Sequence, residues 1–333
     1  MSIGFFPRVL FVATLAALVP ATHASAQEKV SFRLDFRLSG PHIPFYWAAE
    51  KGYYKDEGLE VTIKEGAGSQ QTINLINGRE DDIGLADFYI LANAASRGMP
   101  VKAVFGLVQT NPWAITTYAD SGIKTPKDLE GRSIATLPDH RPLLELFLRR
   151  NAVSPEKMTI RSVNVAVRAT LFAENKVDSL VSQILGTPMD LVARAQEGKG
   201  KPISFLRFTD YSVDSLGPGV FVATSFLQSK PEIVRKFNRA TARAVAETAK
   251  PENFSEAIEI SMKRTGTSEE RRRSLMLQWE ETARTLRSPN TAGKPYGWMS
   301  DEDWKQTLGV LKETQNLPSV AKAADLFTND FLK

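Results

Sequence analysis

The side chains of this chain that could do chemistry are hydrogen-bonding and aromatic groups rather than strong nucleophiles or soft metal ligands. The sequence contains no cysteine, which excludes thiol nucleophiles and thiolate metal sites, and its imidazoles are His23, His42 and His140. It has no G-x-S-x-G, H-E-x-x-H or P-loop pattern. We therefore expect no catalytic residue, no metal and no cofactor, and a binding site becomes the main hypothesis.

Polar residues directly after predicted strands are the first candidates, because ligands of open α/β sheets bind beyond the carboxyl ends of the strands. Ser39 and His42 follow the first predicted strand and could hydrogen-bond a ligand, and Phe45 could stack on one. Gly68 and Ser69 follow the second strand and precede a helix whose free N–H groups could meet an anion. Helix capping, an ordinary turn and aromatic burial explain the same residues equally well.

Two carboxylates and a tryptophan extend this set. Asp35 lies within the first predicted strand and Asp87 just after the third, where either could accept hydrogen bonds from a ligand amine or aminopyrimidine. A structural cap or an ion pair is the competing interpretation, and for Asp35 it is the preferred one. Trp113 lies beside a predicted hinge and is the main stacking candidate.

Two later loops supply the remaining candidates. The loop of residues 137–142 contains two prolines, which lack backbone donors, but Arg141 could present a guanidinium fork to a carboxylate, sulfonate or phosphate. An Arg141 that faces solvent is the equal alternative. Asp139 belongs to the same loop, and Gln183 follows a later predicted strand.

Sheets covered by helices must position these loops. Short β-rich runs alternate with helical runs over the first two-thirds of the chain, which predicts an α/β fold with parallel sheets. Strands are expected over residues 31–36, 60–64, 82–85, 101–107, 133–137, 159–165, 179–182, 203–208 and 220–224, and helices over 45–55, 70–77, 89–97 and 143–151. No internal repeat is evident.

The last third is predicted to be helical. Capping patterns that begin at Ser229, Thr267 and Ser300 each precede a helical run, the second being Thr267-Ser268-Glu269-Glu270. Trp279 and Trp304 fall at helical spacing and are expected in the core. Pro- and Gly-containing segments at 109–112 and 214–219 suit hinges between two lobes.

The N-terminus predicts export. Residues 1–26 form a signal peptide, with Arg8, an apolar run over 9–19 and an A-x-A cleavage site at 24–26. The apolar run is well short of the ~20 residues that span a bilayer. Without a cysteine there is no site for a lipid anchor, so a freely diffusing periplasmic protein is expected. A formal net charge of +4, and an arginine run at 271–273 without interleaved aromatics, predict no nucleic-acid partner.

Three segments stand in a characteristic order: AAEKGYYKDEGLEV at 48–61, IGLAD at 83–87 and SGIKTPKDLEGRSIA at 121–135. Together they resemble the SsuA/THI5-like (NMT1) family of periplasmic substrate-binding proteins. The resemblance implies a two-lobed periplasmic-binding-protein fold of type II, in which each lobe is a sheet flanked by helices and a cleft lies between them. With the predicted hinges, lobe 1 would comprise residues 27–112 and 216–333, and lobe 2 residues 113–215.

Members of this family serve importers of nitrate, sulfonates, taurine, pyrimidine precursors of thiamin, and riboflavin. The resemblance therefore implies a monomer that closes on a small organic ligand, either a pyrimidine or heteroaromatic precursor or a sulfonate- or carboxylate-type anion. It would deliver this ligand to an ABC transporter permease with a cytoplasmic ATPase, or present it to a sensory receptor. The alternative is a THI5-like pyrimidine synthase, which the lack of cysteine and the export signal disfavour, since those synthases resemble this chain but carry a cysteine-rich iron-binding motif.

Overall fold

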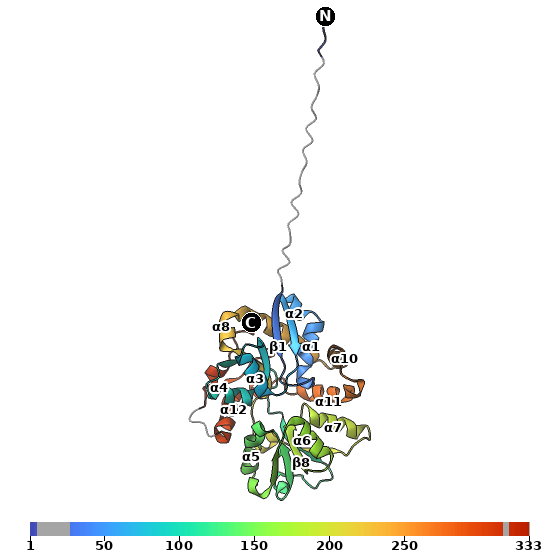
Figure 1. The fold of residues 1–333 in the computed structure, drawn as a ribbon, viewed down its shortest axis with the longest axis vertical. Helices are drawn as coiled ribbons and strands as arrows, with labels where there is room; N and C mark the ends of the chain where they lie inside the picture. The colour runs from blue at the N-terminus through green and yellow to red at the C-terminus, as the bar shows by residue number, and fades with distance from the viewer. Residues whose placement is uncertain (5–26, 316–319, 333) are drawn as a thin grey trace.

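The protein is divided into two lobes, each built on one five-stranded sheet (Figure 1). The computed structural model describes residues 1–4, 27–315 and 320–332. The predicted signal peptide falls largely outside these residues. Within them, no helix has both the length and the apolar character needed to cross a membrane. The α/β class with two helix-flanked sheets is confirmed.

The first lobe holds the sheet with strand order β2-β1-β3-β10-β4. Its strands are β1 (Glu28–Arg33), β2 (Leu59–Lys64), β3 (Ile83–Asp87), β4 (Val101–Gly106) and β10 (Pro218–Ala223). The helices before β10 are α1 (Ile43–Glu50), α2 (Tyr53–Asp56), α3 (Ser69–Asn77) and α4 (Phe88–Ser96). Those after it are α8 (Thr224–Ser229), α9 (Pro231–Thr248), α10 (Phe254–Thr265), α11 (Arg272–Ala283), α12 (Asp301–Thr314) and α13 (Ala323–Leu326).

The second lobe holds the sheet with strand order β7-β6-β8-β5-β9. Its strands are β5 (Trp113–Tyr118), β6 (Ser133–Thr136), β7 (Thr159–Ser162), β8 (Ser179–Gln183) and β9 (Ile203–Arg207), and its helices are α5 (Arg141–Arg150), α6 (Val165–Ala173) and α7 (Thr187–Gln196). The lobe boundaries at 112/113 and 215/216 stay a prediction. The first strand after each crossing is β5, which begins at Trp113, and β10, which begins at Pro218.

The sheets are mixed rather than purely parallel. β10 runs antiparallel to β3 and β4, and β5 runs antiparallel to β8 and β9. These are the strands that enter each sheet directly from the other lobe, so no helix lies between them and the crossing. β5 was not among the predicted strands, because its sequence follows Pro112 at the predicted hinge.

The two lobes repeat one arrangement, although no repeat is evident in the sequence. In each sheet three parallel strands stand in the same relative order, β2-β1-β3 and β7-β6-β8. In the first lobe the Ser31 N–H and hydroxyl both donate to Asp82 at 2.8 Å, and the Asp82 N–H returns a bond to the Ser31 hydroxyl at 3.0 Å. Ser133 and Asp178 make the same reciprocal set in the second lobe.

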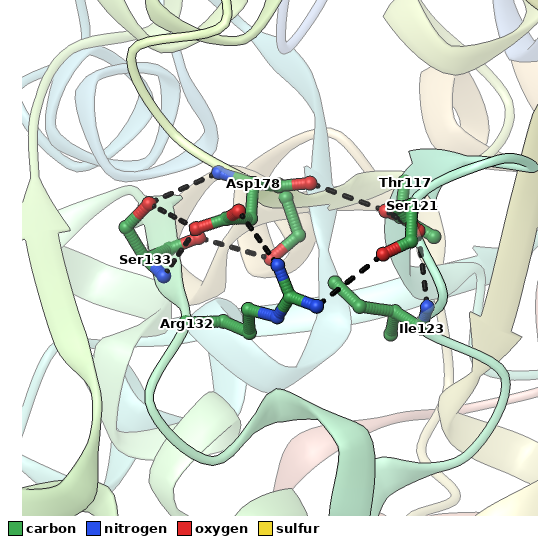
Figure 2. Close-up of polar contacts among 7 residues, drawn as sticks. Thr117, Ser121, Ile123, Arg132, Ser133 and Asp178 are labelled. Atoms are coloured by element: carbon green, nitrogen blue, oxygen red, sulfur yellow. Dashed lines mark hydrogen bonds and ion pairs between the residues drawn. The ribbon is translucent and has the colours of Figure 1, made fainter.

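Figure 2 shows the second-lobe clamp. Asp178 Oδ2 accepts from the Ser133 N–H at 2.8 Å and hydroxyl at 2.6 Å, and Arg132 approaches Oδ1 at 3.4 Å. Thr117 donates to the Asp178 carbonyl at 3.1 Å, which ties in β5. Burial alone would raise the pKa of Asp178, but the bonds from Ser133 and the nearby Arg132 charge outweigh it and lower the pKa. The carboxylate therefore stays ionised and joins the start of β8 to β6, while the backbone carbonyl of Asp178 adds the bond to β5.

Local signals explain most of the remaining differences. The helix predicted over 45–55 is split into α1 and α2 because Gly52 adopts a left-handed conformation, with φ of 77°. Ser229 ends α8 and donates to the Ser225 carbonyl, so Lys230 rather than Ser229 is the N-cap of α9. Ser300 caps α12 as predicted, whereas Ser268 rather than Thr267 caps the 3-10 turn that precedes α11. Trp279 and Trp304 are fully buried, which confirms their core role.

We expect Asp178→Ala to lower the free energy of unfolding by about 2 kcal/mol, because it removes charge-assisted bonds and leaves the Ser133 donors without their acceptor. Urea unfolding at pH 7 measures this. Asp120→Ala is the matched control, since Asp120 is an exposed aspartate of the same lobe that pairs with Lys201. Equal midpoints for the two variants would contradict the clamp.

Candidate functional site

Asp87, the last residue of β3, is a buried polar group where facing strand ends of the two lobes meet, and α11 and α7 make a separate contact between the lobes. The side chain of Asp87 is buried, with 1% of the residue exposed. Oδ1 accepts the Tyr89 N–H at 3.0 Å and so caps α4. Oδ2 accepts the indole N–H of Trp113 at 3.2 Å and the amide of Gln183 at 2.9 Å. Since both of these donors come from the second sheet, one carboxylate joins the two lobes.

The repeated arrangement explains why these residues meet. Asp87 ends β3 five residues after the clamp residue Asp82, and Gln183 ends β8 five residues after Asp178. Trp113 pairs with Gln183 across β5 and β8. The carboxyl ends of the equivalent strands therefore face each other, and three of the predicted site residues, Asp87, Trp113 and Gln183, are brought together.

Burial determines the acid strength of Asp87. It raises the pKa to about 6, although the bonds from Trp113 and Tyr89 act in the opposite direction, and the charge of Asp35 adds to the rise. Asp87 thus titrates near neutral pH, at the contact between the lobes. Both of its oxygens accept hydrogen bonds from protein donors.

A second polar group lies on the other side of Trp113. The His140 ring stacks on the indole with centroids 3.9 Å apart. Its two nitrogens are buried without a hydrogen-bond partner among the described residues. Burial, and next the charge of Arg168, lower the pKa of His140 to about 3, so the imidazole is neutral. Arg168 is itself buried on α6, and burial lowers its pKa to about 10, which leaves it a cation.

Polar side chains of the loop after β1 are hydrogen-bonded within the loop. β1 ends at Arg33, so Asp35 lies beyond the strand rather than within it. The Ser39 N–H donates to His42 Nδ1 at 3.1 Å, which leaves Nε2 to donate to Asp35 Oδ1 at 2.7 Å. Ser39, His42 and Asp35 thus satisfy one another, as the preferred interpretation of Asp35 as a structural partner anticipates.

Gly68 and Ser69 form hydrogen bonds to the backbone of Asp35 and Asp87. The Gly68 N–H donates to the Asp35 carbonyl at 2.7 Å, and the hydroxyl of Ser69 accepts the Asp87 N–H at 3.0 Å. Gly68 has φ of 134°, a conformation that side chains rarely adopt, which explains the glycine. These residues fix the end of β3 and the position of Asp87.

Three predicted residues lie elsewhere. Phe45 is fully buried in the first lobe against Phe32, with ring centroids 4.7 Å apart. Arg141 pairs with Glu145 at 2.8 Å on the surface of α5, with 45% of its side chain exposed. Asp139 is exposed beside it. We leave Phe45 and Arg141 out of the proposed site, because the first has no free face and the second is occupied at the surface.

Sequence comparison is consistent with this architecture. The family model described as NMT1/THI5 like matches residues 39–253, more than half of the chain. The chain belongs to the NMT1/THI5-like family. A riboflavin-binding protein, RibY of Chloroflexus aurantiacus, is 23% identical over 97% of this chain and 95% of its own. A formylaminopyrimidine-binding protein of Halalkalibacterium halodurans is 22% identical over 98% and 97%.

Two further comparisons give a partial match to an enzyme and a structural match to a binding protein. Yeast 4-amino-5-hydroxymethyl-2-methylpyrimidine phosphate synthase THI11 (Saccharomyces cerevisiae) is 26% identical, but over only 65% of this chain and 66% of its own. The crystal structure of the periplasmic aliphatic sulphonate binding protein SsuA from Escherichia coli superposes with a TM-score of 0.68 at 15% identity, over 92% of this chain and 99% of that one. This likeness confirms the fold.

Sequence reasoning missed His140, Arg168 and Ser182 in this NMT1/THI5-like protein. α6 was not predicted, because residues 159–165 were assigned to a strand, and Arg168 was therefore not placed near a strand end. His140 was named as one of the three imidazoles of the chain but not as a site residue. One signal was available, since His42-Ile43-Pro44 and His140-Arg141-Pro142 share an H-x-P spacing at the starts of α1 and α5.

We expect Asp87→Asn to loosen the contact between the lobes. If Oδ1 keeps capping α4, the new amide N–H₂ faces two donors, Trp113 and Gln183, and an acceptor is lost. Hydrogen exchange of the β3 and β8 termini should accelerate about tenfold, which mass spectrometry measures. Adding Gln183→Glu gives the amide an acceptor and should recover most of the protection. No acceleration in the single variant, or no recovery in the double one, would contradict the bridge.

Asp87 also predicts a pH dependence of stability. Its folded pKa of about 6 lies above the ordinary value of 3.8 for an aspartate, so the folded state holds the proton more tightly. The stability that the folded protein gains from holding the Asp87 proton is fully present below about pH 4. It is lost as the pH rises through about 6, and the loss is on the order of 3 kcal/mol. Urea unfolding between pH 4 and pH 7 should show a steeper fall in the free energy of unfolding for the native protein than for Asp87→Asn. The difference between the two proteins reports Asp87, because the other titrating groups contribute equally to both.

Proposed function

We propose that this protein is a periplasmic solute-binding protein that captures a small organic ligand between its lobes and delivers it to an ABC importer. The observation that carries the proposal is the Asp87 carboxylate, which accepts from Trp113 and Gln183 of the other lobe. The strand-end bridge consists of a few hydrogen bonds, and α11 adds polar contacts to the second lobe such as Gln278 to Asp190 at 2.9 Å. Contacts of this kind can open and close at moderate cost.

The two relatives that match over nearly their whole length are named as binding proteins for riboflavin and for formylaminopyrimidine. They support a heteroaromatic ligand, and the SsuA-like fold supports sulfonate- or carboxylate-type anions as the other class. A ligand ring could stack on Trp113, and a ligand amino group could take the place of the Gln183 amide at Asp87. The importer partner would be a permease with a cytoplasmic ATPase, and the protein would act as a monomer.

A pyrimidine synthase is the second candidate, since the yeast enzymes share part of the sequence. Binding is favoured over synthesis because the similarity to the enzymes covers 65% of this chain, whereas the similarity to the two binding proteins covers 97% and 98%. Incubation with pyridoxal phosphate and iron would produce the pyrimidine only if the synthase hypothesis were correct.

The binding hypothesis is tested by thermal shift of the mature protein against riboflavin, hydroxymethylpyrimidine, taurine, alkanesulfonates and aromatic carboxylates. A ligand at 100 times its Kd should add about 2.7 kcal/mol of stability, and small-angle scattering should show a more compact protein. Trp113→Phe keeps a ring but lacks the N–H that bonds Asp87, and we expect a loss of about tenfold in affinity. Trp113→Ala should lose more. If no compound of the panel binds, the proposal is contradicted.

A further inference from the structure

Arg168 presents a free guanidinium edge inside the second lobe. Only 5% of the residue is exposed. Nη1 donates to the Val181 carbonyl of β8 at 2.6 Å, whereas Nε is buried and finds no acceptor in the part of the chain that the structure describes. Nε and Nη2 form the edge with which arginine binds a carboxylate side-on. Nη1 is therefore hydrogen-bonded to the protein, whereas the edge that contains Nε lacks an acceptor among the described residues.

The surroundings of Arg168 offer donors and no negative charge. Within the described ranges no acidic side chain pairs with it, and burial alone perturbs its pKa. Two further polar side chains of the second lobe also lack partners among the described residues: the hydroxyl of Ser182, 2% exposed, and the ring nitrogens of His140, 7% exposed. Ser182 directly follows Val181, whose carbonyl Arg168 bonds, and the charge of Arg168 acts on His140. A buried cation without a counter-charge is costly, and most such groups in proteins are paired or hold an anion.

The position of this cluster is at the edge where the lobes meet. Arg168 lies in the first turns of α6, whose N-terminus is capped by Asn164, and Ser182 precedes Gln183 at the carboxyl end of β8. His140 stacks on Trp113, the donor to Asp87. The unpaired donors thus lie on the second-lobe side of the contact, opposite the fully bonded carboxylate of the first lobe.

We propose that Arg168, with the Ser182 hydroxyl and the neutral His140 ring, binds an oxyanion group of the ligand, a carboxylate or sulfonate attached to an aromatic ring. The inference rests on the proposed function and narrows its ligand to an organic anion. The Nε/Nη2 edge takes two oxygens of the anion, and the hydroxyl and an imidazole N–H each donate one further bond. The ring of the ligand lies against the Trp113 side of the site.

The test compares acids with neutral analogues of the same shape on the mature protein: benzoate with benzamide, nicotinate with nicotinamide, and benzenesulfonate with benzenesulfonamide. By titration calorimetry, at least one acid should bind about 100-fold more tightly than its amide, which corresponds to two charge-assisted bonds. Arg168→Gln should abolish this preference and leave binding of the amide unchanged. Arg168→Lys, which keeps the charge but not the fork, should retain about a tenth of the affinity.

Arg161→Gln is the matched control, because Arg161 is an exposed arginine on β7 of the same sheet, and it should not change the preference. The mature chain contains two histidines, His42 and His140, so imidazole NMR gives a second readout. Binding of the preferred acid should shift the His140 resonances in the native protein and not those of His42. This readout also reports on a variant whose stability is altered.

Three results would overturn the anion site: no acid exceeds its amide, Arg168→Gln keeps the preference, or Arg161→Gln removes it equally. They are separable from failure of the proposed function. If riboflavin or hydroxymethylpyrimidine binds and Arg168→Gln leaves that binding unchanged, the solute-binding function stands and the anion site falls. If no compound of either panel binds, both fall.

Discussion

A buried carboxylate must be supplied with donors, and this requirement organises the facing strand ends at which the two sheets meet. Asp87 cannot be hydrated at its position, so its oxygens are satisfied by the start of α4 and by two side chains of the second sheet. Ser69 holds the Asp87 backbone, and Asp35 holds the loop that carries Gly68 and Ser69. The loops after β1, β2 and β3 therefore form one support for a single acceptor.

The two sides of this contact differ in how completely they are satisfied. On the first-lobe side, Asp87, Asp35 and His42 all have protein partners. On the second-lobe side, Arg168, Ser182 and His140 retain donors without acceptors among the described residues. A folded protein seldom leaves several such groups together in its interior, because each costs free energy. The asymmetry is easiest to understand if the second lobe is completed by a molecule that supplies acceptors.

The sequence predicted the fold class and the loops of the first lobe better than the site in the second. Hydrophobic alternation and turn residues locate most strands, and the rule that ligands bind beyond strand ends led to Asp87 and Gln183, whereas Trp113 was chosen because it lies beside the predicted hinge. β5 was missed because it begins at the crossing, directly after Pro112. Arg168 was missed for a different reason: a cation on a helix becomes informative only when its burial and its lack of a counter-charge are known, and both depend on tertiary packing.

The internal repeat explains why the contact can form at all. Asp87 and Gln183 occupy equivalent positions at the ends of β3 and β8, five residues beyond the matching clamp aspartates. Two carboxylates facing each other there would repel, and one would have to hold a proton. With an acid in one repeat and an amide in the other, the same geometry becomes a hydrogen bond of 2.9 Å. The acid in one repeat and the amide at the equivalent position of the other thus join two opposing strand ends by a hydrogen bond, and a ligand that competes for either end can alter the closure.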